Sequence, residues 1–175
     1  MFRKILVAIN SAVNDRHVFE EALLLAKKTN AQLMLLHVLS PEDQHHSAMP
    51  DTFVPYYYPI IADELTDRYR ENWQMAERDG LATLQSLAAE ATASGITVEF
   101  TQNVGNPSQV ICQFAKDWQA DLILMGRRGR SGLNELFLGS VSNHTLHHAP
   151  CSVLVVQGEI KSSSPSHVDE KATIG

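Results

Sequence analysis

The chain alternates between short apolar runs and segments whose apolar residues recur at helical spacing. Residues 4–9 (KILVAI) form a continuous run rich in β-branched side chains, which predicts a strand covered on both faces, as in a parallel sheet. Residues 32–39, 122–125 and 152–156 have the same character. Residues 96–102 instead alternate between apolar and polar side chains, which predicts a half-exposed strand at the edge of the sheet.

Amphipathic segments separate the predicted strands. Asn14 and Asp15 offer helix N-caps ahead of the first segment, and Asn106 with the proline after it gives the third a cap and a first-turn proline. The second segment is long, stops before Gly95 and contains Gly80 as a candidate bend. The predicted helices cover residues 15–29, 62–94, 106–118 and 140–148.

This order of elements predicts an α/β fold of the doubly wound, Rossmann-like kind. We expect a five-stranded parallel sheet in the order 3-2-1-4-5, with helices on both faces. Residues 1–157 form a single domain in this interpretation, interrupted by an irregular insertion at about 40–60 that is rich in proline, histidine and tyrosine. The serine-rich tail, residues 158–175, has little to bury and is expected to be disordered.

In this strand order the first and fourth strands are neighbours whose connections leave in opposite directions. Ligands of such folds bind outside the carboxyl ends of the strands at this switch point. Gly126 ends the fourth strand, Gly129 follows, and Gly139 with Ser140 opens the last helix. Glycines beside a helix N-terminus let backbone N–H groups face an anion, and the arginines at 127, 128 and 130 add positive charge. The sequence therefore predicts a phosphate site here.

Composition and charge narrow the class of protein. A net charge of -6 argues against a general nucleic-acid binder, which needs clustered positive charge over a wide surface. No apolar run approaches the ~18 residues of a membrane span, and the N-terminal run is too short for a signal peptide. Cys112 and Cys151 lie outside any C-x-x-C spacing and are expected to be buried, reduced thiols. We expect a cytoplasmic protein without a membrane or nucleic-acid partner.

The glycine pattern also separates one nucleotide-binding class from others. No lysine follows a glycine, which excludes a P-loop, and no two glycines are separated by one residue, which excludes the usual dinucleotide fingerprint. The spacing of two residues, then nine, then Gly-Ser resembles the ATP-binding motif of the universal stress protein family. The resemblance extends over nearly the whole chain and is clearest at residues 121–156.

The resemblance implies a site for ATP, or for ADP or AMP, at the switch point. In that family the glycines and the serine contact ribose and phosphates, the backbone of the second strand lies against adenine, and the end of the first strand closes the base and ribose side. The implied site consists of Ile9, Asn10, Val38, Gly126, Arg127, Gly129, Gly139, Ser140 and Val141. The family also forms homodimers through its last strand, here Ser152–Val156, which is a sheet edge without a lysine or proline to block pairing. The alternative is an edge covered by the C-terminal tail.

The chain departs from the family at one position. ATP-binding members carry an aspartate at the end of the first strand, where this chain has Asn10. An amide bonds a ribose hydroxyl but brings no charge to a divalent cation, which argues against magnesium-dependent chemistry. No catalytic or metal-binding residues are assigned, although His144, His147 and His148 share helical spacing that would suit a metal pair. His37, inside the second strand, is interpreted as a polar group near the crevice or a core histidine.

Three hypotheses follow for function. The first is a nucleotide-binding stress-response protein that acts as a homodimer on protein partners. The second is a slow ATPase or nucleotide-processing enzyme, and the third is an interaction module with a vestigial nucleotide site, whose working surface is the tyrosine-rich insertion. The glycines themselves have a structural alternative as turn and helix-start residues without a ligand.

Overall fold

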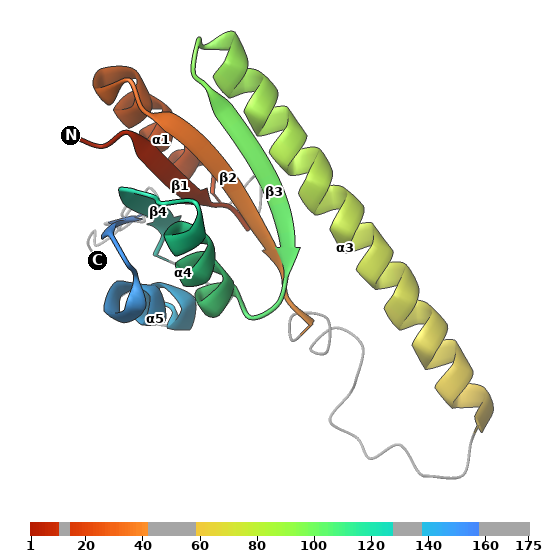
Figure 1. Cartoon of the computed structure of the whole chain (residues 1–175). Coiled ribbons are helices and arrows are strands. Elements are labelled where there is room, and N and C mark those ends of the chain that lie inside the picture. Colours follow the sequence, from red (N-terminus) through yellow and green to blue (C-terminus); the bar gives the residue numbers. More distant parts are fainter. Residues whose placement is uncertain (11–14, 42–58, 128–137, 158–175) are drawn as a thin grey trace, which may run out of the picture.

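The strands form one parallel sheet in the order β3-β2-β1-β4-β5, as predicted (Figure 1). The computed structural model describes residues 1–10, 15–41, 59–127 and 138–157. The strands are β1 Lys4–Ala8, β2 Gln32–Leu39, β3 Val98–Val104, β4 Leu122–Gly126 and β5 Ser152–Val156. The helices are α1 Arg16–Thr29, α3 Pro59–Ala93, α4 Pro107–Asp117 and α5 Ser140–His148.

Helices cover both faces of the sheet, which confirms the doubly wound α/β prediction (Figure 1). Side chains alternate between the two faces along each strand. Ile5 and Val7 of β1 therefore pack beneath α1 and α3, whereas Leu6 between them packs on the side of α4 and α5. All three are fully buried, and each contributes about 1.5–3 kcal/mol through the apolar surface that it removes from water.

Asp121 fixes the register between β1 and β4 at the amino end of the sheet. Its carboxylate accepts hydrogen bonds from the backbone N–H groups of Arg3 (2.8 Å) and Lys4 (2.9 Å), which lowers its pKa below the ordinary value. The Lys4 ammonium group also donates to the carbonyl of Trp118 at 2.9 Å. These contacts set where both strands begin and therefore where both end.

The third strand begins two residues later than the alternating pattern predicted. Ile96 lies outside β3 because it closes the end of α3: its N–H donates to the carbonyl of Ala91 at 3.1 Å, and its side chain is buried. Gly95, with φ of +78°, supplies the left-handed turn that makes this bond possible. β3 does lie at the sheet edge and is partly exposed, as predicted.

Gly80 allows a close contact in α3, and the helix continues through it without a break. A Cβ at this position would lie 2.6 Å from Nδ1 and 2.7 Å from Cε1 of His37, distances that real Cβ atoms do not show. Glycine at this position is therefore explained by close packing against His37, and not by a bend in the helix. Its missing side chain lets α3 lie directly on β2.

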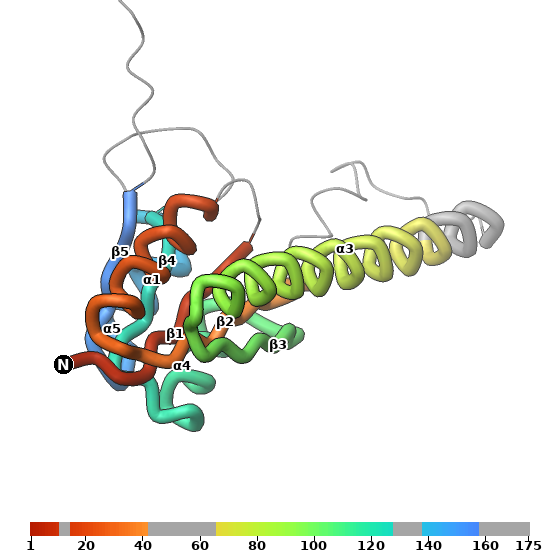
Figure 2. Tube along the Cα trace, turned by 90° about the horizontal axis from the view of Figure 1, so that it is seen from above, coloured from red at the N-terminus to blue at the C-terminus, as the bar shows by residue number. Residues whose placement is uncertain are grey.

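The N-terminal half of α3 extends beyond the sheet, as Figures 1 and 2 show. The predicted insertion falls largely on residues 42–58, outside the described residues, as does the tail at 158–175. Within the described ranges no helix combines the length with the apolar character needed to cross a bilayer.

Candidate functional site

The candidate site lies at the carboxyl ends of β1 and β4, the switch point of the sheet. The two strands are direct neighbours, and their last paired residues are Ala8 and Met125. β1 is followed in the chain by α1, which covers one face of the sheet, and β4 is followed by α5, which covers the other (Figure 1). This divergence brings Ile9 and Asn10 alongside Gly126 at the same edge.

Hydrogen bonds tie the N-terminus of α5 to the end of β4. The N–H of Gly139 donates to the carbonyl of Arg127 at 3.1 Å, and the hydroxyl of Ser142 donates to the carbonyl of Gly126 at 3.0 Å. Ser142 is buried, so its bond is shielded from water. Sequence reasoning missed this residue, because a serine in the first turn of a helix gives no sign of which carbonyl it will reach.

This connection brings the first turn of α5 to the switch point. The first N–H groups of a helix have no partner within it, so those of Ser140 and Val141 present partial positive charge there. The Ser140 side chain is exposed, whereas Val141 packs on the core beside α4. Gly139 has φ of −60° and ψ of 156°, an extended conformation that any residue adopts. Its backbone conformation therefore does not require glycine.

Gly126, in contrast, is constrained by its neighbours. A Cβ there would lie 3.2 Å from Oδ1 of Asp15 and 3.4 Å from Cγ2 of Val18, both in the first turn of the chain into α1. The missing side chain lets this turn approach β4. Gly126 can allow this close packing and also leave room for the predicted ligand, so the two explanations for glycine are compatible.

Asp15 is placed differently from the prediction of a helix cap. It does precede α1, but its side chain makes no cap bond to the helix. Oδ2 of Asp15 instead accepts a hydrogen bond from the N–H of Asn10 at 2.7 Å. The Asp15 carboxylate therefore lies at the end of β1, although Asn10 replaces the aspartate that the family has there. The lack of charge on Asn10 is thus a weaker argument against cation binding than it was from the sequence alone.

Two apolar residues of the predicted set lie on adjacent strands at this edge. Ile9 is 3% exposed and faces the side of α1, while Val38 of β2 is 9% exposed and faces the side of α4. The N–H of Ile9 donates to the carbonyl of Leu36 at 2.9 Å, which extends the pairing of β1 with β2 up to the edge.

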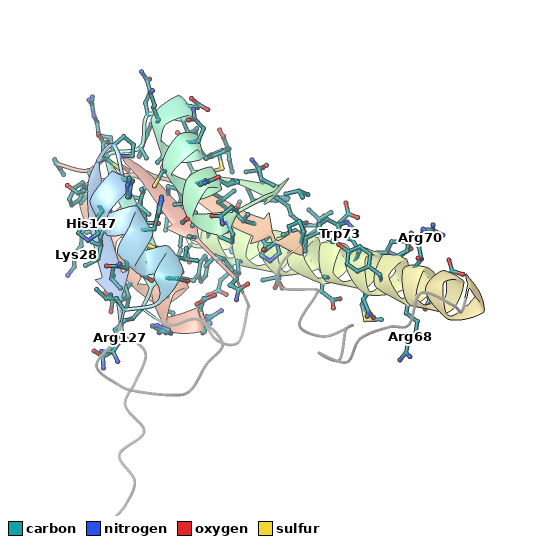
Figure 3. All side chains as sticks on the ribbon, turned by 90° about the horizontal axis from the view of Figure 1, so that it is seen from below. Lys28, Arg68, Arg70, Trp73, Arg127 and His147 are labelled. Carbon is teal, nitrogen blue, oxygen red and sulfur yellow. The ribbon has the colours of Figure 1, made fainter. Side chains whose placement is uncertain are left out.

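Of the arginines in the glycine motif, Arg127 lies within the residues that the structure describes. Its N–H continues the sheet by donating to the carbonyl of Val156 at 3.0 Å, and its guanidinium donates to Oε1 of Gln157 at 3.2 Å. Figure 3 shows the side chain at the end of β5, on the outside of the sheet. Gly129, Arg128 and Arg130 lie outside the described residues.

The histidines take other places. His37 is 7% exposed and lies beneath Gly80, so it is a core histidine under α3. The rings of His144 and His148 stack with centroids 4.1 Å apart, and Nδ1 of His148 lies 2.8 Å from the carbonyl oxygen of His144. Within the described ranges, no three His, Cys, Asp or Glu side chains gather as metal ligands would.

Both cysteines are free, as expected, but each is half-buried and not buried as the sequence predicted. Burial raises the pKa of the Cys112 thiol and of the Cys151 thiol above the ordinary value. Both are therefore mainly protonated at neutral pH, and neither has the lowered pKa of a reactive cysteine.

We expect Ser142→Ala to lower the free energy of unfolding by about 1–2 kcal/mol, because it leaves the Gly126 carbonyl without its buried donor. Urea denaturation measures the change. Ser140→Ala is the matched control, since that side chain is exposed in the same turn, and it should shift stability by less than about 0.5 kcal/mol. Equal stability of the two variants would contradict the anchoring role of Ser142.

Together, the order of the parallel strands and the helices on both faces define a doubly wound α/β protein. A sequence profile of the universal stress protein family matches residues 1–157, and the chain belongs to this family. Universal stress protein Sll1388 of Synechocystis sp. is 35% identical over 156 residues, covering 89% of this chain and 98% of that protein. Universal stress protein YxiE of Bacillus subtilis is 32% identical over 157 residues, covering 90% of this chain and all of that protein.

Solved structures show the same fold. Hypothetical protein MJ0577 superposes with a TM-score of 0.68 at 21% identity, covering 91% of this chain and 99% of that one. A universal stress family protein of Arabidopsis thaliana with AMP bound gives a TM-score of 0.61 at 21% identity, covering 94% and 97%. A universal stress protein in complex with cAMP gives 0.60 at 24% identity, covering 89% and 97%. At these levels of sequence identity the superpositions show a shared fold, and this fold is the one predicted from the sequence.

Proposed function

We propose that this protein binds an adenine nucleotide, ATP or its di- or monophosphate, in the switch-point crevice. The observation that carries the proposal is the first turn of α5, tied to the end of β4 so that unpaired helix N–H groups meet the crevice. Gly139 adds a second argument, because a residue without a side chain at the N-cap of α5 leaves room for a ligand to approach the N–H groups of Ser140 and Val141. The AMP and cAMP held by the two family structures add support.

The residues present fit such a ligand. Gly139, Ser140 and Val141 would hold phosphates through backbone N–H groups and the Ser140 hydroxyl, with Gly126, Arg127 and Gly129 beside them. The Val38 backbone would contact the base, Ile9 would close the base and ribose side, and Asn10 would hydrogen-bond the ribose. Helix dipole and backbone donors suit a bound anion without any catalytic group, so we assign a binding role.

We also propose a regulatory role in the stress response, exercised as a homodimer, which family membership supports. β5 occupies one edge of the sheet, and a second copy would pair with this edge. We infer that residues 1–157 form the nucleotide-binding domain and that the liganded state is what partners recognise. We further propose that the protein acts in the cytoplasm, as expected from the sequence.

Calorimetric titration tests the binding proposal. The full chain, freed of bound nucleotide by denaturation and refolding, is titrated with ATP, ADP and AMP at near-physiological salt, with GTP as the comparison. We expect saturable binding of one adenine nucleotide per chain and weaker binding of GTP. No heat with any adenine nucleotide would overturn the proposal.

A further inference from the structure

The N-terminal half of α3 carries an apolar stripe that continues past the sheet. We define the stripe as Tyr69, Trp73 and Ala76, which recur at steps of four and three residues. The same rhythm leads through Gly80 to Leu84, which is fully buried on the sheet. Positions three or four apart lie on one face of a helix, so the stripe is the sheet-facing side of α3 continued beyond the sheet.

The stripe has the character of a packing surface. The rings of Tyr69 and Trp73 stack with centroids 6.3 Å apart, and both residues are half-buried. Figure 3 shows Trp73 on the opposite side of the helix from Arg68 and on the same side as Arg70. Figures 1 and 2 show the labelled strands and helices ending before they reach this part of α3.

Chain connectivity points to what covers it. His37 lies against Gly80, and β2 ends two residues later at Leu39, whereas α3 begins at Pro59. At a rise of about 1.5 Å per residue, Pro59 lies roughly 30 Å along the helix axis from Gly80. Residues 42–58 must span this distance, and their extended reach of roughly 55–60 Å is about twice what is needed. The stripe therefore lies along α3 between Gly80, where β2 contacts the helix, and Pro59, the first residue after the segment.

The segment also has suitable chemistry. It includes Phe53 and Val54, followed after one proline by Tyr56, Tyr57 and Tyr58. Large aromatic side chains gain the most by leaving water, and pairs of aromatic rings add about 0.5–1.5 kcal/mol beyond the buried area. Being tethered to β2 at one end and to α3 at the other gives the segment a high effective concentration at the stripe, which no separate partner matches.

We propose that residues 42–58 pack their aromatic side chains on the Tyr69, Trp73 and Ala76 stripe. The insertion is then the cover of the projecting half of α3 and completes its hydrophobic face. Its tyrosines are committed to the chain itself, which argues against the insertion as a free docking surface for other proteins.

Fluorescence of Trp73 tests this proposal. Trp118→Phe leaves Trp73 as the single tryptophan of the full chain. In this background we expect acrylamide to quench Trp73 several-fold less than it quenches N-acetyltryptophanamide, at every protein concentration. Replacing Phe53, Val54, Tyr56, Tyr57 and Tyr58 by serine should raise quenching several-fold and shift emission to the red. Replacing Gln44, His45, His46 and Thr52 by serine is the matched control and should change neither.

Three results would overturn the proposal. Quenching of Trp73 in the background chain equal to that of the free indole would show that nothing covers the stripe. Protection that persists in the aromatic-to-serine variant would assign the cover to something else. Protection that disappears on dilution would assign it to a second copy of the chain. If the multiple variant does not fold, as judged by circular dichroism, Phe53→Ser and Tyr57→Ser carry the same expectation singly at smaller amplitude.

Discussion

We expect Gly139→Val to abolish adenine nucleotide binding at the proposed site and to leave the fold intact. The branched side chain would occupy the space beside the N–H groups of Ser140 and Val141, where phosphates approach. The backbone of Gly139, at φ −60° and ψ 156°, accommodates valine without strain. Loss of a favourable N-cap residue costs about 1 kcal/mol, so the melting temperature should fall by only about 2–4 °C. Calorimetry measures the affinity, and circular dichroism measures the fold.

Asn143→Val is the matched control for this variant. It places the same side chain one turn further along α5, at an exposed position, and should preserve binding. Affinity of Gly139→Val within a factor of two of the wild type would show that the ligand does not approach this residue. Joint loss of binding and of the cooperative melting transition would show that the glycine is structural instead.

The second large effect concerns the packing of α3. We expect Gly80→Leu to lower the free energy of unfolding by about 3 kcal/mol, because its side chain would displace the buried His37 ring and the layer around it. Gly80→Ala combines the same Cβ contact with a gain of about 1 kcal/mol in helix propensity, so it should destabilise less. Urea denaturation followed by circular dichroism measures both.

Two further variants make this measurement specific. Ala82→Leu adds a comparable side chain on the exposed side of the same helix and should change stability by less than about 0.5 kcal/mol. His37→Ala in the Gly80→Leu background should recover part of the loss, since it removes the atoms that the new side chain meets. Wild-type stability of Gly80→Leu would refute the close contact of α3 with β2.

The fold was predictable because its signals are local and repeated. Continuous apolar runs with helical segments between them define a parallel sheet, and this pattern placed β2 and β5 at the residues where the structure has them. The end of α3 was less predictable. Ile96 belongs to the alternating pattern of the strand by sequence, but its N–H closes the helix, and only the tertiary position of Gly95 and Ala91 decides between these roles.

The candidate site was predictable as a location and less so in its contacts. The glycines mark the switch point from sequence alone, but the partners of Ser142 and Asp15 are backbone groups where β4 and β1 end. Hydrogen bonds of that kind depend on how α5 and α1 approach β4, which residue spacing does not encode. Gly80 shows the same limit, since a mid-helix glycine is as consistent with a bend as with a close helix-to-strand contact.

Nuclear magnetic resonance with uniformly ¹⁵N-labelled protein tests the central claim most directly. Backbone amide shifts are followed during titration with ATP. If the nucleotide binds at the N-terminus of α5, the largest changes in amide shift should fall on Gly126, Arg127, Gly139, Ser140 and Val141. Smaller changes are expected at Ile9, Asn10 and Val38, and none along β3. An unchanged spectrum, or shifts centred on α3 with α5 unaffected, would contradict a nucleotide site at the N-terminus of α5.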